Sequence, residues 1–307
     1  MVALNKQVEE KPALPKELCG YEVLGFLGQG AASDIYLVSH PQSKQVYALK
    51  YVVRKTDKDD RFIEQLETEF EASRLVAHRG LRKCLEFKVN RTFLRKAIDA
   101  ILVMELMDGS PLETRPPANV LETIDCFIQT GSALQSLHDL GYVHCDLKPN
   151  NILRSVSGHV KVIDLGQAAK IGTAKKRIQG TPDYIAPEQV KLLPVTPKTD
   201  VYNFGATLYW ALTGRNLPTL FTVGKGENSF LVNDRISTPH ELNASVPEQL
   251  SNLVMECVRL NPVKRPEMTE VIRRLEIMDH AVRRDSQGES TFNHASEFAR
   301  RPLAQAV

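Results

Sequence analysis

The spacing of apolar residues changes from a strand pattern to a helix pattern along this chain. The first part predicts short β-strands separated by turn signals, at 21–24, 34–38, 45–50, 83–90 and 98–105. One helix interrupts them at 60–77, with apolar residues at Phe62, Leu66, Phe70 and Val76. Helical spacing then dominates over 121–140, up to Leu212, and over 248–260 and 268–280. This order predicts an α+β fold with two lobes, a small β-rich lobe with one main helix and a larger helical lobe.

The same pattern sets the expected limits of the two lobes. Residues 19–107 predict the β-rich N-terminal lobe, and residues 108–282 predict the helical C-terminal lobe. Residues 1–18 are polar and dotted with proline, and 283–307 are polar and weakly patterned, so both ends are expected to be flexible. Within the helical lobe, 215–247 is rich in Asn, Gly, Ser, Thr and Pro and predicts a long irregular connection.

Composition narrows the class of protein. A chain of 307 residues with 42% hydrophobic residues can form a sizeable core. Lys and Arg (39) nearly balance Asp and Glu (37), and a net charge of +2 gives no reason to expect nucleic acid or an anionic membrane surface as a partner. The longest apolar stretches, 100–104 and 204–212, are too short to span a bilayer, so no membrane span is expected.

The cysteines indicate the redox environment. There are five, an odd number, and they are scattered without a C-x-x-C pair: Cys19, Cys84, Cys126, Cys145 and Cys257. This pattern favours neither a zinc site nor a disulfide framework. Because the N-terminus also lacks the basic-then-apolar pattern of a signal peptide, a cytoplasmic protein is expected.

Two short segments hold the residues with the most specific chemistry. Residues 144–151 read His-Cys-Asp-Leu-Lys-Pro-Asn-Asn and place Asp146, Lys148 and Asn151 on one loop, while Asp164 begins an Asp-Leu-Gly sequence further on. Phosphoryl transfer needs such a set: a carboxylate that orients a hydroxyl, a cation near the moving group, and oxygen ligands for Mg²⁺. Each residue alone could be a turn or strand cap, but their combination in this order favours phosphoryl transfer.

The first segment resembles the catalytic loop of eukaryotic-like (Hanks-type) serine/threonine protein kinases, H-R-D-L-K-P-x-N. Cys145 replaces the arginine, which is the pattern of the non-RD variant. The resemblance implies ATP and Mg²⁺ as cofactors and serine or threonine hydroxyls of proteins as acceptors. It implies that Asp146 orients or accepts the hydroxyl proton and that Lys148 neutralises charge on the γ-phosphoryl group. The implied Mg²⁺ ligands are Asn151 and Asp164.

A glycine-rich turn, Gly28-Gln29-Gly30, joins the first two predicted strands. Glycine lets a backbone approach phosphates closely, although an ordinary hairpin turn explains the pattern about as well. The turn precedes a strand and not a helix, which argues against a Rossmann dinucleotide site. By the resemblance, this turn covers ATP, and the adenine pocket is formed by Ile35, Ala48, Glu105, Met107 and Leu153.

Lys50 ends the Ala-Leu-Lys sequence of the third strand, a position where a lysine is often merely solvated. The resemblance pairs it with Glu69 on the following helix, so that its ammonium group can hold the α- and β-phosphates. Glu67 and Glu71 have nearly the same spacing, but the offset from His78 favours Glu69.

Further matches imply structural roles. Residues 180–188 resemble the family's peptide-binding platform, and Glu188 at its end is expected to form a buried salt bridge with Arg265. Asp200 is expected to brace the catalytic-loop backbone and to lie at the cap of a helix that stops at Gly214. The hydroxyl of Thr181 is expected to tie the catalytic aspartate to the lysine, as in the serine/threonine branch.

Cys145 also bears on regulation. In most family members the arginine at this position binds a phosphate on the activation segment, and here Arg177 stands where that phosphorylated residue is usual. An active conformation that does not depend on phosphorylation there is therefore predicted, with Thr173 as another possible site. Cys145 itself is expected to be a small buried side chain and not a nucleophile or redox switch.

Two other functions stay open, a pseudokinase that serves as a nucleotide-binding scaffold and a kinase for small molecules. The first is disfavoured because Lys50, Asp146, Asn151 and Asp164 are all intact. The second is disfavoured by the peptide platform at 180–188. The physiological substrate and the oligomeric state are left open by the sequence pattern.

Overall fold

The computed structural model describes residues 14–30, 32–222 and 236–298, which fall into two compact units. The first unit runs to Phe70 and resumes over Lys83–Leu106. The second comprises Glu71–Arg82 and the chain from Met107 onward. Parts of four predicted segments lie outside the described residues: 1–13 of the lead-in, Ala31 beside the glycine-rich turn, 223–235 of the connection and 299–307 of the tail.

The sequence pattern predicted a single boundary between the two lobes, after residue 107, and this differs from the division in the structure. Residues 71–82 belong to the second unit because Ala72, Val76 and Leu81 are buried in its hydrophobic core. The periodicity of apolar residues predicts a helix, but it does not show which hydrophobic core each turn of that helix packs against.

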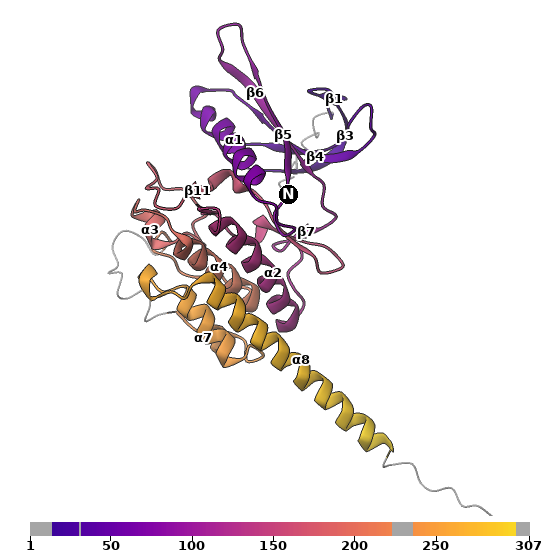
Figure 1. Ribbon diagram of the computed structural model, residues 1–307, viewed down its shortest axis with the longest axis vertical. Helices are drawn as coiled ribbons and strands as arrows, with labels where there is room; N and C mark the ends of the chain where they lie inside the picture. The colour runs from indigo at the N-terminus through magenta and orange to yellow at the C-terminus, as the bar shows by residue number, and fades with distance from the viewer. Residues whose placement is uncertain (1–13, 31, 223–235, 299–307) are drawn as a thin grey trace, which may run out of the picture. The chain divides into compact units, whose positions relative to one another are not determined.

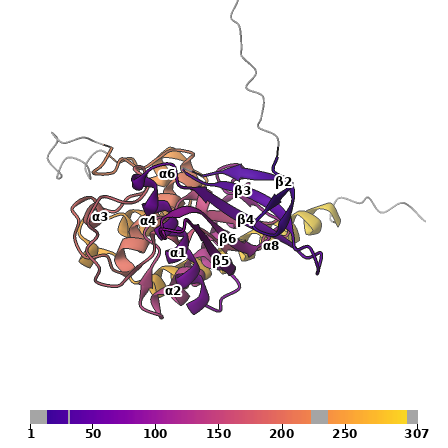
Figure 2. The same ribbon diagram turned by 90° about the horizontal axis from the view of Figure 1, so that it is seen from above.

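The first unit is built on an antiparallel sheet of six strands in the order β1-β2-β3-β4-β6-β5, which can be followed from above in Figure 2. The strands are β1 (Glu17–Leu18), β2 (Tyr21–Gln29), β3 (Asp34–Ser39), β4 (Val46–Val53), β5 (Cys84–Arg91) and β6 (Ala97–Glu105). The α+β prediction is confirmed here, because one helix, α1 (Asp60–Leu75), accompanies the sheet.

Side-chain alternation gives the sheet two buried faces. Successive residues of a strand point to opposite faces, so Leu49 and Ile101 pack into one cluster while Ala48 and Leu102 pack into another. The second cluster also contains Leu66 of α1, which places α1 on that face.

The second unit is mainly helical. Its helices, drawn in Figure 1, are α2 (Val120–His138), α3 (Pro187–Val190), α4 (Pro197–Thr213), α6 (Pro239–Leu242), α7 (Glu248–Cys257) and α8 (Met268–Phe298). Phe127 of α2 meets Phe204 of α4 edge-on, with ring centroids 5.1 Å apart. Gly131 lets α2 approach α8 closely, because a Cβ there would lie 2.9 Å from Cγ1 of Ile272. In the part of the chain that the structure describes, no helix is long and apolar enough to cross a bilayer.

Short strands join the loops of this unit. β7 (Ser110–Pro111), β9 (Ile152–Arg154) and β10 (Val160–Val162) form one small sheet, and β8 (Tyr142–Val143) pairs with β11 (Ala169–Lys170). The hairpin β9–β10 follows the catalytic loop directly and leads into the Asp-Leu-Gly segment. Its pairing therefore fixes where those two segments lie relative to each other.

Two details differ from the expectations. The N-cap of α4 is Thr196, whose amide donates to Oγ1 of Thr199, and Asp200 is buried inside the first turns. The helix does end at Gly214, which has φ 68°, as predicted. The expected flexible tail from residue 283 is wrong as far as Phe298, because α8 continues to that residue without a break, with an ion pair between Arg283 and Asp279 on its surface.

Candidate active site

Lys50 and Glu69 form an ion pair in the first unit, with Nζ 2.9 Å from Oε2. Lys50 shares its strand face with Ala48, which packs in the cluster that contains α1. Glu69 is buried on the same helix side as Leu66, three residues earlier, whereas the rivals Glu67 and Glu71 are exposed. Tertiary packing thus selects Glu69 from three glutamates of similar spacing.

The glycine-rich turn joins β2 and β3. Gly28 pairs with Ile35, Gln29 pairs with Asp34, and the Gly30 amide donates to the carbonyl of Ser33 over 2.7 Å. A Cβ on Gly30 would meet Oγ of Ser33 at 2.7 Å, but a Cβ on Gly28 would meet nothing within 4 Å. The fold therefore gives a steric reason for glycine at position 30 but none at position 28.

The residues expected around adenine divide between the units. In the first unit Ala48 of β4 lies opposite Met104 of β6, and Glu105 ends β6. In the second unit Met107 follows the end of β6, and Leu153 lies on β9 opposite Pro111. Ile35, also in the first unit, is the register partner of Lys50 on the neighbouring strand.

Asp146, Lys148 and Thr181 form a closed triangle of polar contacts in the second unit. Nζ of Lys148 donates to Oγ1 of Thr181 over 2.8 Å, and that hydroxyl donates to Oδ1 of Asp146 over 2.9 Å. Oδ2 of Asp146 lies 3.3 Å from the same ammonium group. The arrangement holds a carboxylate and a lysine ammonium group at a fixed separation.

The backbone of the catalytic loop is held by one buried carboxylate. Asp200 accepts from the amide of His144 over 2.8 Å and from the amide of Cys145 over 2.9 Å. The Nε2 atom of His138 lies 2.8 Å from Oδ2 of Asp200 and completes the set. Burial opposes the charged form of Asp200, but the hydrogen bonds from His138 and the Cys145 amide help to lower the pKa of the carboxyl below its ordinary value.

His144 links the catalytic loop to the segment before Asp164. Its Nδ1 accepts from the Asp146 amide over 3.2 Å, and its Nε2 lies 3.1 Å from the carbonyl oxygen of Ile163. Because a carbonyl can only accept, the proton of the neutral ring is on Nε2. The side chain is fully buried and orients both chain segments at once.

Asn151 and Asp164 offer oxygen donors, the type that Mg²⁺ prefers. The β9–β10 register places Ile152 opposite Val162, and the amide of Ile163 donates to the carbonyl of Asn151 over 2.9 Å. Nδ2 of Asn151 donates to the Asp146 carbonyl over 2.8 Å, so its Oδ1 is left for another partner. Asp164 has a left-handed backbone with φ 63° at the start of a short helical turn. The donor set of these residues fits a magnesium ion.

Cys145 is a buried structural residue. Its side chain packs with Val143 and Val195, and burial raises the pKa of its thiol, so the reactive thiolate is disfavoured. Its backbone has φ 66°, a strained value for a residue with a Cβ. The carbonyl of Cys145 accepts from Nε2 of Gln189 over 2.7 Å, and that contact holds the strained peptide in place.

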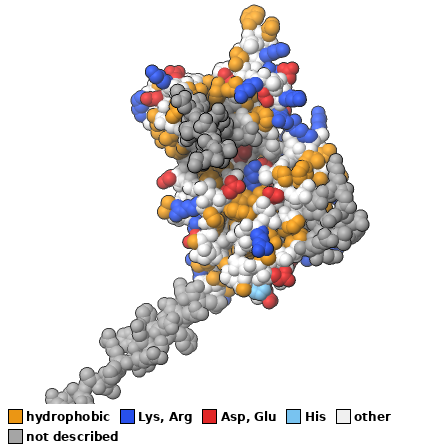
Figure 3. Space-filling view, turned by 180° about the vertical axis from the view of Figure 1, so that it is seen from behind, with side chains coloured by type: hydrophobic (Ala, Val, Ile, Leu, Met, Phe, Trp, Pro, Cys, Tyr) orange, Lys and Arg blue, Asp and Glu red, His pale blue; other side chains and the backbone are white. Residues whose placement is uncertain are grey.

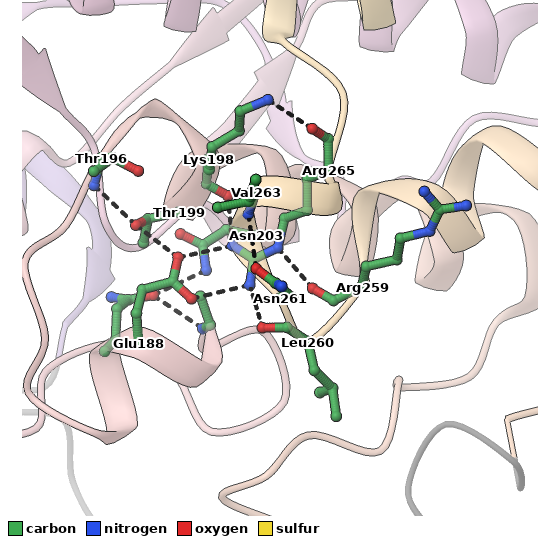
Figure 4. A network of polar contacts seen from close by, with 12 residues as sticks. Glu188, Thr196, Lys198, Thr199, Asn203, Arg259, Leu260, Asn261, Val263 and Arg265 are labelled. Carbon is green, nitrogen blue, oxygen red and sulfur yellow. Dashed lines mark hydrogen bonds and ion pairs between the residues drawn. The ribbon is translucent and has the colours of Figure 1, made fainter. Parts of the chain in front are cut away.

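A buried arginine joins the end of the peptide platform to the segment after α7. Arg265 binds Glu188 through two parallel hydrogen bonds of 2.7 and 2.9 Å. Its other N–H groups donate to the carbonyls of Lys198, Arg259 and Leu260, so all five donors have acceptors (Figure 4). The predicted Glu188–Arg265 pair is therefore present and fully hydrogen-bonded.

Several supporting residues escaped the sequence analysis. His138 contacts Asp200, Gln189 contacts the catalytic loop and Lys175 contacts the segment after Asp164, yet none of the three belongs to a motif that was singled out. A signal was present for His138, because a histidine in the last turn of an otherwise apolar helix face is unusual. Their contacts join residues far apart in the chain, which spacing does not report.

The chain matches the protein kinase domain over residues 21–275. Because this match covers most of the chain, the chain belongs to the protein kinase family. Its two units, a curled β-sheet with one helix and a helical body, agree with that family.

Proteins similar in sequence to this chain occur in bacteria and mammals. The chain is 28% identical over 256 residues to serine/threonine-protein kinase PknA of Mycobacterium tuberculosis, a match that covers 81% of this chain and 57% of PknA. It is 26% identical to serine/threonine-protein kinase PrkC of Bacillus subtilis, with 81% and 39% covered. It is 30% identical to ribosomal protein S6 kinase alpha-3 of Mus musculus, with 89% and 37% covered. The chain therefore spans between 37% and 57% of the length of these relatives.

Proposed function

We propose that this chain is an ATP- and Mg²⁺-dependent protein kinase that transfers the γ-phosphoryl group of ATP to serine or threonine hydroxyls of proteins. The observation that carries the proposal is the triangle of Asp146, Lys148 and Thr181, in which a carboxylate and an ammonium group are fixed by one threonine hydroxyl. The names of the relatives, serine/threonine-protein kinases, support the acceptor class.

Each residue has a defined task in this mechanism. The Asp146 carboxylate orients the acceptor hydroxyl and takes its proton, and Lys148 offsets charge on the group that moves. Lys50, held by Glu69, binds phosphate oxygens. Asn151 and Asp164 would hold Mg²⁺, which when bound neutralises charge on the phosphates.

Adenine recognition is assigned to Ile35, Ala48, Glu105, Met107 and Leu153. The open space beside Gly28 supports a backbone that phosphates approach, since the fold itself gives no steric reason for glycine there. Gln29 and Gly30 complete this turn.

Transfer of radiolabelled γ-phosphate to a generic basic protein tests the proposal. We expect label on serine or threonine in the presence of Mg²⁺, and its loss with EDTA. Label on tyrosine alone, or only on small-molecule acceptors, would contradict the acceptor class. ATP binding without any transfer would instead favour the alternative, a pseudokinase scaffold.

We further propose that the active conformation is of the non-RD type and does not require a phosphate on the activation segment. Lys175 supports this idea, because its ammonium donates to the carbonyl of Gln167, three residues after Asp164. The segment is also tied by two backbone bonds, from Gly172 to the Val195 carbonyl (2.8 Å) and from Val195 to the Thr173 carbonyl (3.0 Å). A cation within the segment therefore does the anchoring that a phosphate and an arginine do elsewhere.

Replacing Lys175 by methionine is expected to lower kcat about tenfold or more, the effect of one hydrogen bond from a charged donor. Faster limited proteolysis after Lys176 or Arg177 should accompany the loss, because the segment is released. Lys176→Met, an exposed neighbour, is the matched control and should keep the wild-type rate. Loss of activity after phosphatase treatment, or in Thr173→Ala with phosphate present on active wild-type protein, would contradict phosphate independence.

The five cysteines are all free thiols. Free thiols persist in a reducing compartment, which supports a cytoplasmic location for this activity.

A further inference from the structure

The β5–β6 hairpin presents two large apolar side chains to solvent at its turn. Phe93 is 102% exposed and Leu94 is 79% exposed, whereas every other exposed large apolar side chain among the described residues of the first unit is at most 49% exposed. In Figure 1 the hairpin projects beyond the other strands of its sheet, and Figure 3 shows hydrophobic side chains at its tip with Lys and Arg side chains beneath them. These two residues contribute nothing to a core.

The turn that holds them is well formed. The Thr92 amide donates to the Lys96 carbonyl over 2.8 Å, the Arg95 amide donates to the Thr92 carbonyl over 2.8 Å, and the Lys96 amide donates to Oγ1 of Thr92 over 3.2 Å. Arg95 has φ 62°, a backbone region that favours glycine or asparagine. The sequence places an arginine there at a cost in backbone strain, so the turn geometry does not explain its presence.

The charged side chains that the hairpin itself carries around its tip all have one sign, and Asp60 of α1 interacts electrostatically with one of them, Lys96. Between Lys88, which pairs with Glu86, and Asp99 the chain carries Arg91, Arg95 and Lys96 and no carboxylate. Among the residues that the structure describes, these three cations take part in no ion pair. Nη1 of Arg91 does donate to the Arg95 carbonyl over 3.2 Å, which holds that guanidinium beside the turn. The hairpin therefore has a local excess of positive charge, although the net charge of the whole chain is only +2.

We propose that the hairpin tip is a contact site for an anionic lipid surface. Phe93 and Leu94 would enter the boundary between head groups and acyl chains, and the three cations would bind the acidic head groups. A lipid surface deforms around a convex tip, whereas a protein partner must supply a pocket of matching shape, so the geometry favours lipid. The proposal is independent of the kinase mechanism, because it uses none of the residues assigned to it.

Co-sedimentation of the full chain with vesicles tests this site directly. We expect binding to phosphatidylcholine vesicles that contain phosphatidylserine, and little binding to phosphatidylcholine alone. Phe93→Ser combined with Leu94→Ser should weaken binding at least about tenfold, because each buried side chain contributes more than that factor. Arg95→Gln and Lys96→Gln should weaken it about fivefold each, and added salt should weaken wild-type binding.

Val156→Ser is the matched control, since Val156 is an apolar residue as exposed as Leu94 (79%) on the β9–β10 turn, and the cation near it, Arg154, is paired with Glu122. It should leave binding unchanged, and all variants should keep the wild-type melting temperature and transfer activity. Phe93→Trp gives a second readout, an emission blue shift with anionic vesicles. Absence of wild-type binding, equal binding to neutral vesicles, or sedimentation without lipid through self-association would each overturn the proposal.

Discussion

Replacing Asp146 by asparagine is expected to lower kcat for phosphoryl transfer by about 10²–10⁴-fold while ATP affinity changes little. The amide oxygen of asparagine can still accept the Thr181 hydroxyl, which now lies 2.9 Å from Oδ1. The amide takes no proton, however, and its NH₂ group would face the Lys148 ammonium where Oδ2 now lies 3.3 Å away. Single-turnover assays with radiolabelled ATP and calorimetric measurement of ATP binding separate the two effects.

The same chemical change at Asp139 is the matched control. That carboxylate is exposed at the end of α2 and accepts only from Nε2 of Gln135 among the hydrogen bonds of the described residues, a contact that asparagine can keep. Asp139→Asn should therefore transfer at the wild-type rate. If Asp146→Asn also kept that rate, Asp146 would not be the group that takes the hydroxyl proton.

Replacing Arg265 by methionine is expected to lower the free energy of unfolding by about 3–5 kcal/mol, the cost of leaving a buried charge without its partner. The side chain of Arg265 is 0% exposed and that of Glu188 is 5% exposed, so neither can recover a hydration shell. Three backbone carbonyls would lose a donor as well. Denaturant unfolding followed by circular dichroism measures the loss.

An exposed ion pair of the same chemistry provides the comparison. Arg273 and Glu270 are one turn apart on α8, with side chains 61% and 40% exposed, and Arg273→Ala should leave the free energy of unfolding nearly unchanged. Should Arg265→Met fail to yield folded protein, Arg265→Lys keeps the charge without the two-pronged geometry and should show an intermediate loss. Equal stability of the Arg265 and Arg273 variants would contradict the role of burial.

Local pattern was sufficient for most of the secondary structure. The predicted strand at 45–50 is β4 (Val46–Val53), and the predicted helix at 121–140 is α2 (Val120–His138). Both signals come from neighbouring side chains that share a face, which a sequence shows directly. The end of α8 was missed, because the last part of that helix, past His280, shows little apolar periodicity from which to predict it.

Residue order also predicted a chemistry for the catalytic loop, phosphoryl transfer, which the proposed function adopts. The offset from His78 favoured Glu69 over Glu67 and Glu71, and the structure pairs Glu69 with Lys50. The sequence pattern also predicted Asp200 at a helix cap, and this was wrong. The Asp200 carboxylate is buried within α4 and accepts hydrogen bonds from the amides of His144 and Cys145, which are 56 and 55 residues away in the sequence.

The sequence by itself determined the family pattern, the order of strands and helices, and the residue types available for phosphoryl transfer, because these depend on the identity and spacing of near neighbours. The tertiary structure decided that Glu69 is buried while Glu67 and Glu71 are exposed, how Asp200 and His144 hold the catalytic loop, and that Lys175 donates to the segment after Asp164. Those contacts join residues distant in sequence, and each forms only where packing brings a donor to an acceptor and removes water from both.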